Sequence, residues 1–166
     1  MGSMTVSETG AMRALTLRLQ DEIFAIEAES VREILDLVPI TEVPNAPAFV
    51  GGLINVRGRV VPLADLRVVF AMERPPADQD TRIVVIEVDI DGEAAIVGIL
   101  ADKVHDVTDI EASAIQDAPR VGMRWRPDYV RAIGKRNGSF VIIPNLTRIF
   151  ETQGRRSAPS AEERAA

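Results

Sequence analysis

Tight-turn dipeptides divide the middle of this sequence into pairs of short apolar runs, and this feature limits the possible fold more than any other. The dipeptides are Arg57-Gly58, Asp91-Gly92 and Asn137-Gly138. Each predicts a hairpin turn, because glycine, asparagine and aspartate tolerate the positive φ angles of tight turns. The flanking runs are residues 53–56 and 59–63, 83–88 and 95–100, and 130–133 and 140–143. We therefore expect three antiparallel hairpins.

A fourth hairpin is indicated near the N-terminus by alternating side chains. Leu15, Leu17 and Leu19 alternate with polar residues, which is the period-2 pattern of a half-buried strand. Phe24 and Ile26 follow after a short polar turn. Short strands separated by regular turns are typical of β-barrels and β-sandwiches. The expected fold class is therefore all-β.

Helical content is expected to be minor. Residues 48–51 predict a single turn, and residues 146–150 predict a short C-terminal helix with Asn145 as its N-cap. The segment 31–38 has helical spacing but is rich in β-branched residues, so we expect a short turn followed by a strand. Pro62 places its strand at a sheet edge or a bulge, because proline cannot donate to the strand ladder.

The chain is expected to form one domain with polar ends. Residues 1–12 are small and polar, start with what resembles an expression scar, Met1-Gly2-Ser3-Met4, and are expected to be disordered. Residues 154–166 are rich in Ala, Ser, Glu and Arg, and disorder is expected there too. Residues 13–153 are expected to form a single domain of two β-barrel subdomains. An internal loop is expected near residues 72–81, where a Pro-Pro pair interrupts the strand pattern.

Composition and charge argue against nucleic-acid and membrane partners. Apolar residues make up 46% of the chain, which is enough for a core, and the net charge is −6. Nucleic-acid binders instead concentrate positive charge and stack bases on aromatic side chains. This chain has only seven aromatic residues (five Phe, one Trp and one Tyr). No apolar run approaches the roughly 18 residues of a membrane span, so we expect no direct membrane insertion. The absence of cysteine fits a cytoplasmic protein.

Residues that could perform catalysis or bind a cofactor are scarce. His105 is the only histidine, and although Asp106 beside it could complete half of a proton relay, no nucleophile lies in a recognisable frame. We therefore interpret His105 as a surface or strand-edge residue, and a zinc site would need more ligands than the chain contains. The segment 89–92 lacks the spaced acids of a calcium loop, and Gly51-Gly52 lacks the Lys-Ser/Thr of a phosphate-binding loop. We predict no enzyme, no metal and no cofactor.

Residues 40–70 contain three motifs in a fixed order. Val43-Pro44-Asn45-Ala46-Pro47-Ala48-Phe49 is followed by Gly52-Leu53-Ile54-Asn55-Val56-Arg57-Gly58, and then by Val60-Val61-Pro62-Leu63-Ala64-Asp65-Leu66. In this order and spacing they resemble the central signature of the CheW family of chemotaxis coupling proteins. Further matching blocks are Val31-Arg32-Glu33-Ile34, residues 97–104, Ile133-Gly134 and residues 141–146. The resemblance extends from Leu15 to Phe150.

The resemblance implies a fold, a function and partners. It implies two small five-stranded barrels packed around a shared hydrophobic seam, with a groove between them. It implies a non-catalytic adaptor that couples the cytoplasmic hairpin tip of a chemoreceptor to the regulatory domain of the histidine kinase CheA. Such an adaptor is cytoplasmic and is recruited to receptor arrays at the membrane. The residues that match the family's receptor-binding positions are Val31, Glu33, Ile34 and Arg57. The residues that we assign to kinase binding are Gly52, Gly98, Leu100, Asp102 and Val104.

Several alternatives stay open for these residues and for the function. Val31 and Ile34 could be core residues, and Arg57 could fix the hairpin turn or bind a carboxylate such as Glu33. Gly52 and Gly98 could be needed for close packing of neighbouring strands rather than for contact with a partner. The chain could also be a CheW-like scaffold of a different sensory or motility phosphorelay. A small-molecule-binding barrel is disfavoured, because the strand interiors are aliphatic and should be filled.

Overall fold

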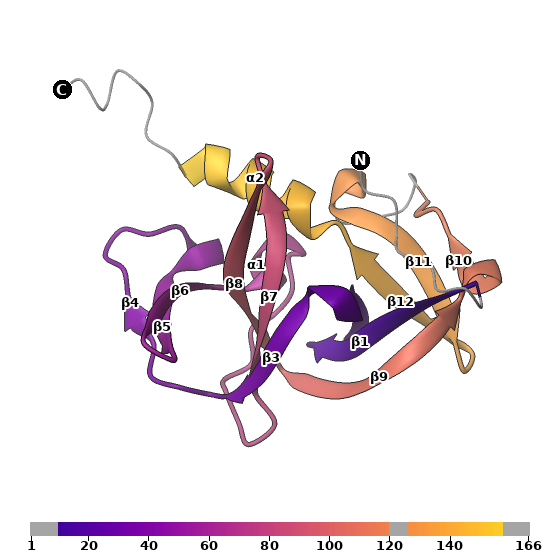
Figure 1. Ribbon diagram of the computed structural model, residues 1–166, viewed down its shortest axis with the longest axis horizontal. Helices are drawn as coiled ribbons and strands as arrows, with labels where there is room; N and C mark the ends of the chain where they lie inside the picture. The colour runs from indigo at the N-terminus through magenta and orange to yellow at the C-terminus, as the bar shows by residue number, and fades with distance from the viewer. Residues whose placement is uncertain (1–9, 120–125, 158–166) are drawn as a thin grey trace.

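The computed structural model describes residues 10–119 and 126–157, which form two curled β-sheets and two helices (Figure 1). The first half of the described chain forms β1 (Ala11–Leu19), β2 (Glu22–Glu27), η1 (Ala28–Ser30), β3 (Val31–Asp36), β4 (Thr41–Glu42), η2 (Ala48–Val50), β5 (Gly52–Val56), β6 (Arg59–Ala64) and α1 (Leu66–Val69). The second half forms β7 (Arg82–Ile90), β8 (Glu93–Ala101), β9 (Lys103–Glu111), η3 (Ala112–Ala114), β10 (Ile115–Gln116), η4 (Pro127–Tyr129), β11 (Val130–Arg136), β12 (Ser139–Pro144) and α2 (Leu146–Ser157). The disorder expected for residues 1–12 and 154–166 is wrong where those ends are described, because Ala11 and Met12 are buried in β1 and residues 154–157 continue α2; the remainder of both ends lies outside the described residues.

The two sheets confirm the predicted all-β architecture. Sheet A has the strand order β10-β11-β12-β2-β1-β9, and sheet B has the order β3-β7-β8-β6-β5-β4. Each described sheet contains six strands where five were expected, because β4 and β10, of two residues each, add a short strand to one edge. The sheets are curled half-barrels that lie side by side (Figure 1).

The two halves of the chain repeat the same elements and exchange a hairpin. Hairpin β1–β2 lies in sheet A beside the later strands β9 to β12, whereas hairpin β7–β8 lies in sheet B beside the earlier strands β3 to β6. In each sheet the exchanged hairpin makes a parallel pairing, β12 with β2 and β6 with β8. The equivalence extends to single bonds: the Asp65 amide donates to the Phe49 carbonyl and the Asn145 amide to the Tyr129 carbonyl, both at 2.8 Å.

The apolar residues form three layers, as alternation along the strands dictates. In β1, Leu15, Leu17 and Leu19 face the space between the sheets, whereas Met12 and Ala14 face the interior of sheet A. The layer between the sheets is the expected shared seam, and it includes Phe24 and Ile26 of β2, Val84, Ile86 and Val88 of β7, and Val97 and Ile99 of β8. The interior of sheet B is filled by Ile54, Val56, Val61, Leu63, Ile83 and Val85.

The four predicted hairpins are confirmed, and their turns have the expected backbone geometry. Arg57, Asp91 and Asn137 have φ angles of 54°, 52° and 51°, and the glycine after each is also at positive φ. Gln20 at the β1–β2 turn has φ 55°. In the Arg57-Gly58 turn, the Asn55 side chain further fixes the loop by accepting a 2.8 Å hydrogen bond from the Gly58 amide.

The short helices also agree with the sequence, with one correction to a neighbouring strand. Asn145 caps α2, because its Oδ1 accepts from the Arg148 amide at 3.1 Å, and the helix continues beyond the expected residue 150. The prediction that Pro62 marks an edge strand or a bulge is wrong, since β6 lies between β5 and β8. The parallel ladder between β6 and β8 involves Leu63 and Ala64 and begins after Pro62. The missing N–H of Pro62 therefore costs this ladder no hydrogen bond.

Neither of the helices in residues 10–119 and 126–157 has the length and hydropathy needed to cross a bilayer.

Candidate functional site

Three of the four residues assigned to receptor binding lie on β3, and the fourth, Arg57, reaches them from the β5–β6 turn. The Arg57 guanidinium donates to both oxygens of the Glu33 carboxylate, with Nε at 3.3 Å from each oxygen and the second terminal nitrogen at 3.0 Å from Oε2. The hydrogen bonds and charge of Glu33 raise the pKa of Arg57. Arg57 therefore combines both expected roles, because it occupies a positive-φ turn position and also holds Glu33. We call Val31, Glu33, Ile34 and Arg57 the receptor-side cluster, after the role that the sequence resemblance predicts for them.

The two apolar members of this cluster differ in burial. Val31 is half-buried and packs against the seam, whereas Ile34 is 44% exposed. A register shift between Val31 and Glu33 interrupts the pairing of β3 with β7. Such bulges re-aim the side chains of a strand. Val31 is therefore a packing residue at the rim of the seam, and Ile34 is available for contact.

Sequence reasoning missed further exposed apolar side chains close to this cluster in the chain. Leu37 and Ile40 lie on the connection from β3 to β4, Val43 directly follows β4, and Val60 lies on β6 after the Arg57-Gly58 turn; all are exposed. For Leu37, Ile40 and Val43 the signal was present, since they fall outside the alternation of the strands and near Pro39 and Pro44. The segment from β3 to β6 thus exposes several single apolar side chains.

Two of the residues assigned to kinase binding are buried glycines. A Cβ added to Gly52 would collide with the Ile40 side chain. At Gly98, a Cβ would lie 3.2 Å from the Ile83 side chain and 3.4 Å from those of Ile54 and Leu63. Both glycines therefore allow close packing, which is the alternative left open by the sequence.

The other three residues of this set lie around the β8–β9 corner. Leu100 and Val104 are half-buried, the first against the interior of sheet B and the second against the seam. Asp102 lies between β8 and β9. Its two carboxylate oxygens accept hydrogen bonds from the Arg67 side chain at 2.8 Å and from the backbone amide of Gln20 at 2.6 Å. The structure thus gives Asp102 a role inside the fold.

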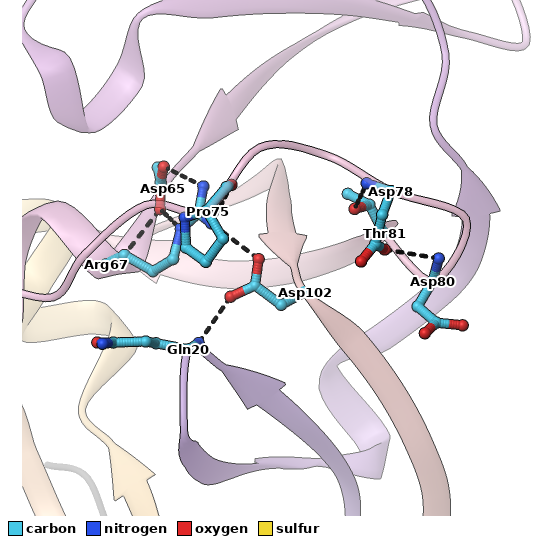
Figure 2. Close-up of polar contacts among 8 residues, drawn as sticks. All are labelled: Gln20, Asp65, Arg67, Pro75, Asp78, Asp80, Thr81 and Asp102. Atoms are coloured by element: carbon cyan, nitrogen blue, oxygen red, sulfur yellow. Dashed lines mark hydrogen bonds and ion pairs between the residues drawn. The ribbon is translucent and has the colours of Figure 1, made fainter.

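Arg67, which sequence reasoning missed, is the centre of a buried polar network (Figure 2). Its side chain is 6% exposed. It donates to both oxygens of Asp65 at 2.9 Å, to Asp102, and to the Pro75 carbonyl at 3.4 Å. Hydrogen bonding to Asp65 raises the pKa of Arg67 despite the opposing effect of burial. We call Gln20, Asp65, Arg67, Pro75 and Asp102 the Arg67 junction.

A groove of about 770 Å³ lies between the sheets, beside the first turns of α2. Its lining residues include Glu27, Glu29, Glu87, Asp89, Arg131 and Glu151. Arg131 is paired with Glu27 at 3.0 Å, so carboxylates dominate the walls. Ser30 also lines the groove, which therefore reaches the residue that precedes β3.

His105 is exposed on β9, as the sequence indicated. Its neighbour Asp106 is engaged elsewhere, because it accepts from the Thr16 hydroxyl at 3.1 Å and lies 3.7 Å from the Arg136 guanidinium. These residues line a shallow depression together with Ile23 and Val141. Asp106 thus joins β9 to β1 by hydrogen bonds and to β11 by an ion pair.

Comparisons with known proteins place this arrangement in context. The model of the CheW-like domain family matches residues 13–154. The chain is 29% identical over 151 residues to the chemotaxis protein CheW of Klebsiella aerogenes, covering 91% of this chain and 89% of the relative. It is 30% identical over 141 residues to a probable chemotaxis protein CheW of Rhizobium etli, with 85% and 88% covered. The crystal structure of the scaffolding protein TtCheW from Thermoanaerobacter tengcongensis superposes with a TM-score of 0.76 at 30% identity, covering 87% of this chain and 95% of that one.

Proposed function

The chain belongs to the CheW-like domain family, and from that premise we propose that it is a non-catalytic adaptor that couples chemoreceptor signalling tips to the histidine kinase CheA. The observation that supports this most strongly is the pairing of Arg57 with Glu33 in a segment, β3 to β6, that also exposes several apolar side chains. Family membership supplies the scaffold role, and this surface offers a place where a partner can dock.

The receptor-side cluster has the chemistry to bind an amphipathic helical hairpin. Helices bind through apolar anchors that recur at helical spacing, and charged residues at the rim set orientation and exclude wrong partners. Ile34 and its exposed apolar neighbours supply the first element. The Glu33–Arg57 pair supplies the second, and the Arg57 side chain is 81% exposed and can reach a carboxylate of the partner.

We propose that the regulatory domain of CheA binds elsewhere, around the β8–β9 corner. Leu100 and Val104 are the half-buried apolar residues there that can touch a partner, while Gly52, Gly98 and Asp102 support the surface from within. Separate surfaces let one chain hold both partners at once. Modest contacts of this kind gain strength when many copies assemble, which fits a cytoplasmic protein recruited to receptor arrays.

Substitutions in the receptor-side cluster should weaken receptor binding selectively. Arg57→Ala removes a rim cation, and Ile34→Glu places a charge at an exposed apolar position of β3. We expect each to weaken binding of the receptor tip about tenfold, or by about 1.4 kcal/mol, because effects above about 1 kcal/mol mark the minority of interface residues that carry most of the binding energy. Isothermal titration calorimetry with a receptor hairpin fragment measures this directly.

The control for this test is Arg59→Ala, which removes an exposed arginine from the same hairpin. It should leave the receptor affinity within twofold of the parent, and all three variants should bind the kinase regulatory domain normally. Thermal unfolding followed by circular dichroism verifies that each variant is folded. Undiminished receptor affinity in both Arg57→Ala and Ile34→Glu would remove this cluster from the receptor site.

A further inference from the structure

The exchange of hairpins creates points at which the chain crosses from one sheet to the other, in addition to the apolar contact across the seam. The β1–β2 hairpin lies in sheet A, but its tip meets the corner between β8 and β9, where the chain leaves sheet B for sheet A. At this corner the Asp102 amide donates to the Arg18 carbonyl at 3.0 Å, and its carboxylate accepts from the Gln20 amide at 2.6 Å. A single residue thus ties the tip of a sheet A hairpin to the end of a sheet B strand.

Arg67 holds the carboxylate of Asp102 in this position from the sheet B side. It lies in α1, directly after β6, and its position is itself fixed by Asp65, which caps the same helix. Its contact with the Pro75 carbonyl adds the loop between α1 and β7 (Figure 2). That loop is closed by Asp78 and Thr81, which exchange hydrogen bonds of 2.9 and 3.2 Å. The junction therefore joins four segments around one buried guanidinium.

The equivalent crossing point on the other hairpin is built differently. At the β7–β8 tip, the Asp91 amide donates to Glu151 of α2 at 2.8 Å, in an exposed position. Thr147 stands in α2 where Arg67 stands in α1, counted from the capping residues Asn145 and Asp65. A buried bond of a charged group resists solvent and holds geometry better than an exposed one. The polar contact at the Arg67 junction is thus buried, whereas the contact at the other hairpin tip is exposed, and we expect the junction to hold its geometry better.

We infer that Arg67 and Asp102 are positioning residues that fix the orientation of sheet B relative to sheet A. Through this orientation, a partner docked on the receptor-side cluster of sheet B constrains a partner that touches the β8–β9 corner. The coupling part of this inference rests on the proposed adaptor function, whereas the orientation of the sheets does not require any partner.

The orientation is testable by a distance measurement between the sheets. The chain has no cysteine, so spin labels can be attached at Val60→Cys on β6 and Phe140→Cys on β12, which are 67% and 70% exposed. Double electron–electron resonance on the full chain should give one narrow distance distribution. Adding Arg67→Met should broaden or shift that distribution. An unchanged distribution in a folded Arg67→Met protein would overturn the inference.

Two further variants make the result decisive. Arg32→Met removes an ion pair with Glu87 in which both side chains are exposed, at 48% and 41%, and should leave the distribution unchanged. Asp102→Asn keeps the side-chain shape and weakens the junction, so it should broaden the distribution; should Arg67→Met not fold, this variant decides. Binding of the receptor fragment and of the kinase domain is then measured separately. If the parent chain binds neither, the adaptor function is refuted, but the distance result on the orientation of the sheets still holds.

Discussion

Phe24→Ala is expected to lower the free energy of unfolding by about 3–5 kcal/mol, the range for truncating a buried phenylalanine. Phe24 is 0% exposed and lies in the seam between the sheets. Its ring is 5.1 Å from that of Phe70, in a tilted pair that adds to the burial of its surface. Since the seam contains residues of both sheets, a cavity there weakens the contact that unites them. Urea unfolding, followed by tryptophan fluorescence and circular dichroism, measures the change.

The control is Phe140→Ala, because Phe140 is the most exposed of the large apolar side chains on the described surface, at 70%. That substitution should change the free energy of unfolding by no more than about 0.5 kcal/mol. Equal effects of the two alanines would mean that the layer between the sheets is not the structural core.

The second large effect is expected for Arg67→Met. This change removes the cation from the Arg67 junction and leaves the carboxylates of Asp65 and Asp102, which are 16% and 12% exposed, without their partner. Breaking a buried ion pair in this way commonly costs 3–5 kcal/mol, and some access of water to the two carboxylates favours the lower end, about 3 kcal/mol. Equilibrium unfolding in urea gives the value.

A double-mutant cycle shows whether the loss comes from the junction. Asp102→Asn removes the charge that Arg67 faces, so in its presence Arg67→Met should cost less, with a coupling energy of about 1 kcal/mol or more. Arg32→Met, at the exposed ion pair with Glu87, should cost less than about 1 kcal/mol. Strict additivity of the Arg67 and Asp102 substitutions would contradict a direct interaction between them in solution.

The hairpins could be predicted from the sequence because their determinants are local. A turn such as Asn137-Gly138 fixes its two strands through backbone conformations that depend on those residues alone. The cap of α2 at Asn145 was predictable for the same reason. The exchange of hairpins between the sheets could not be predicted. Periodicity indicates which side chains of a strand are buried, but it does not indicate which other strand pairs with it. The error at Pro62 has this origin, since the parallel pairing of β6 with β8 joins residues far apart in the chain.

The site residues divide in the same way. The Glu33–Arg57 interaction could be suggested from the sequence, because each residue lies in a segment that matches the family. The structure shows the two side chains hydrogen-bonded. Arg67 was missed because a basic residue between apolar residues, here the second residue of the short helix α1, looks like ordinary solvent-facing charge. Its burial follows from the approach of Asp102 and the 72–81 loop, which no local pattern encodes.

The most direct test of the adaptor function is a bridging experiment. Receptor signalling hairpins are displayed on vesicles, and the CheA regulatory domain is added with and without this chain before sedimentation. We expect the kinase domain to sediment with the vesicles when this chain is present, to a smaller extent with Arg57→Ala, and at background level when the chain is left out. A kinase domain that stays in the supernatant under all conditions, while the chain itself binds neither partner, would contradict the account.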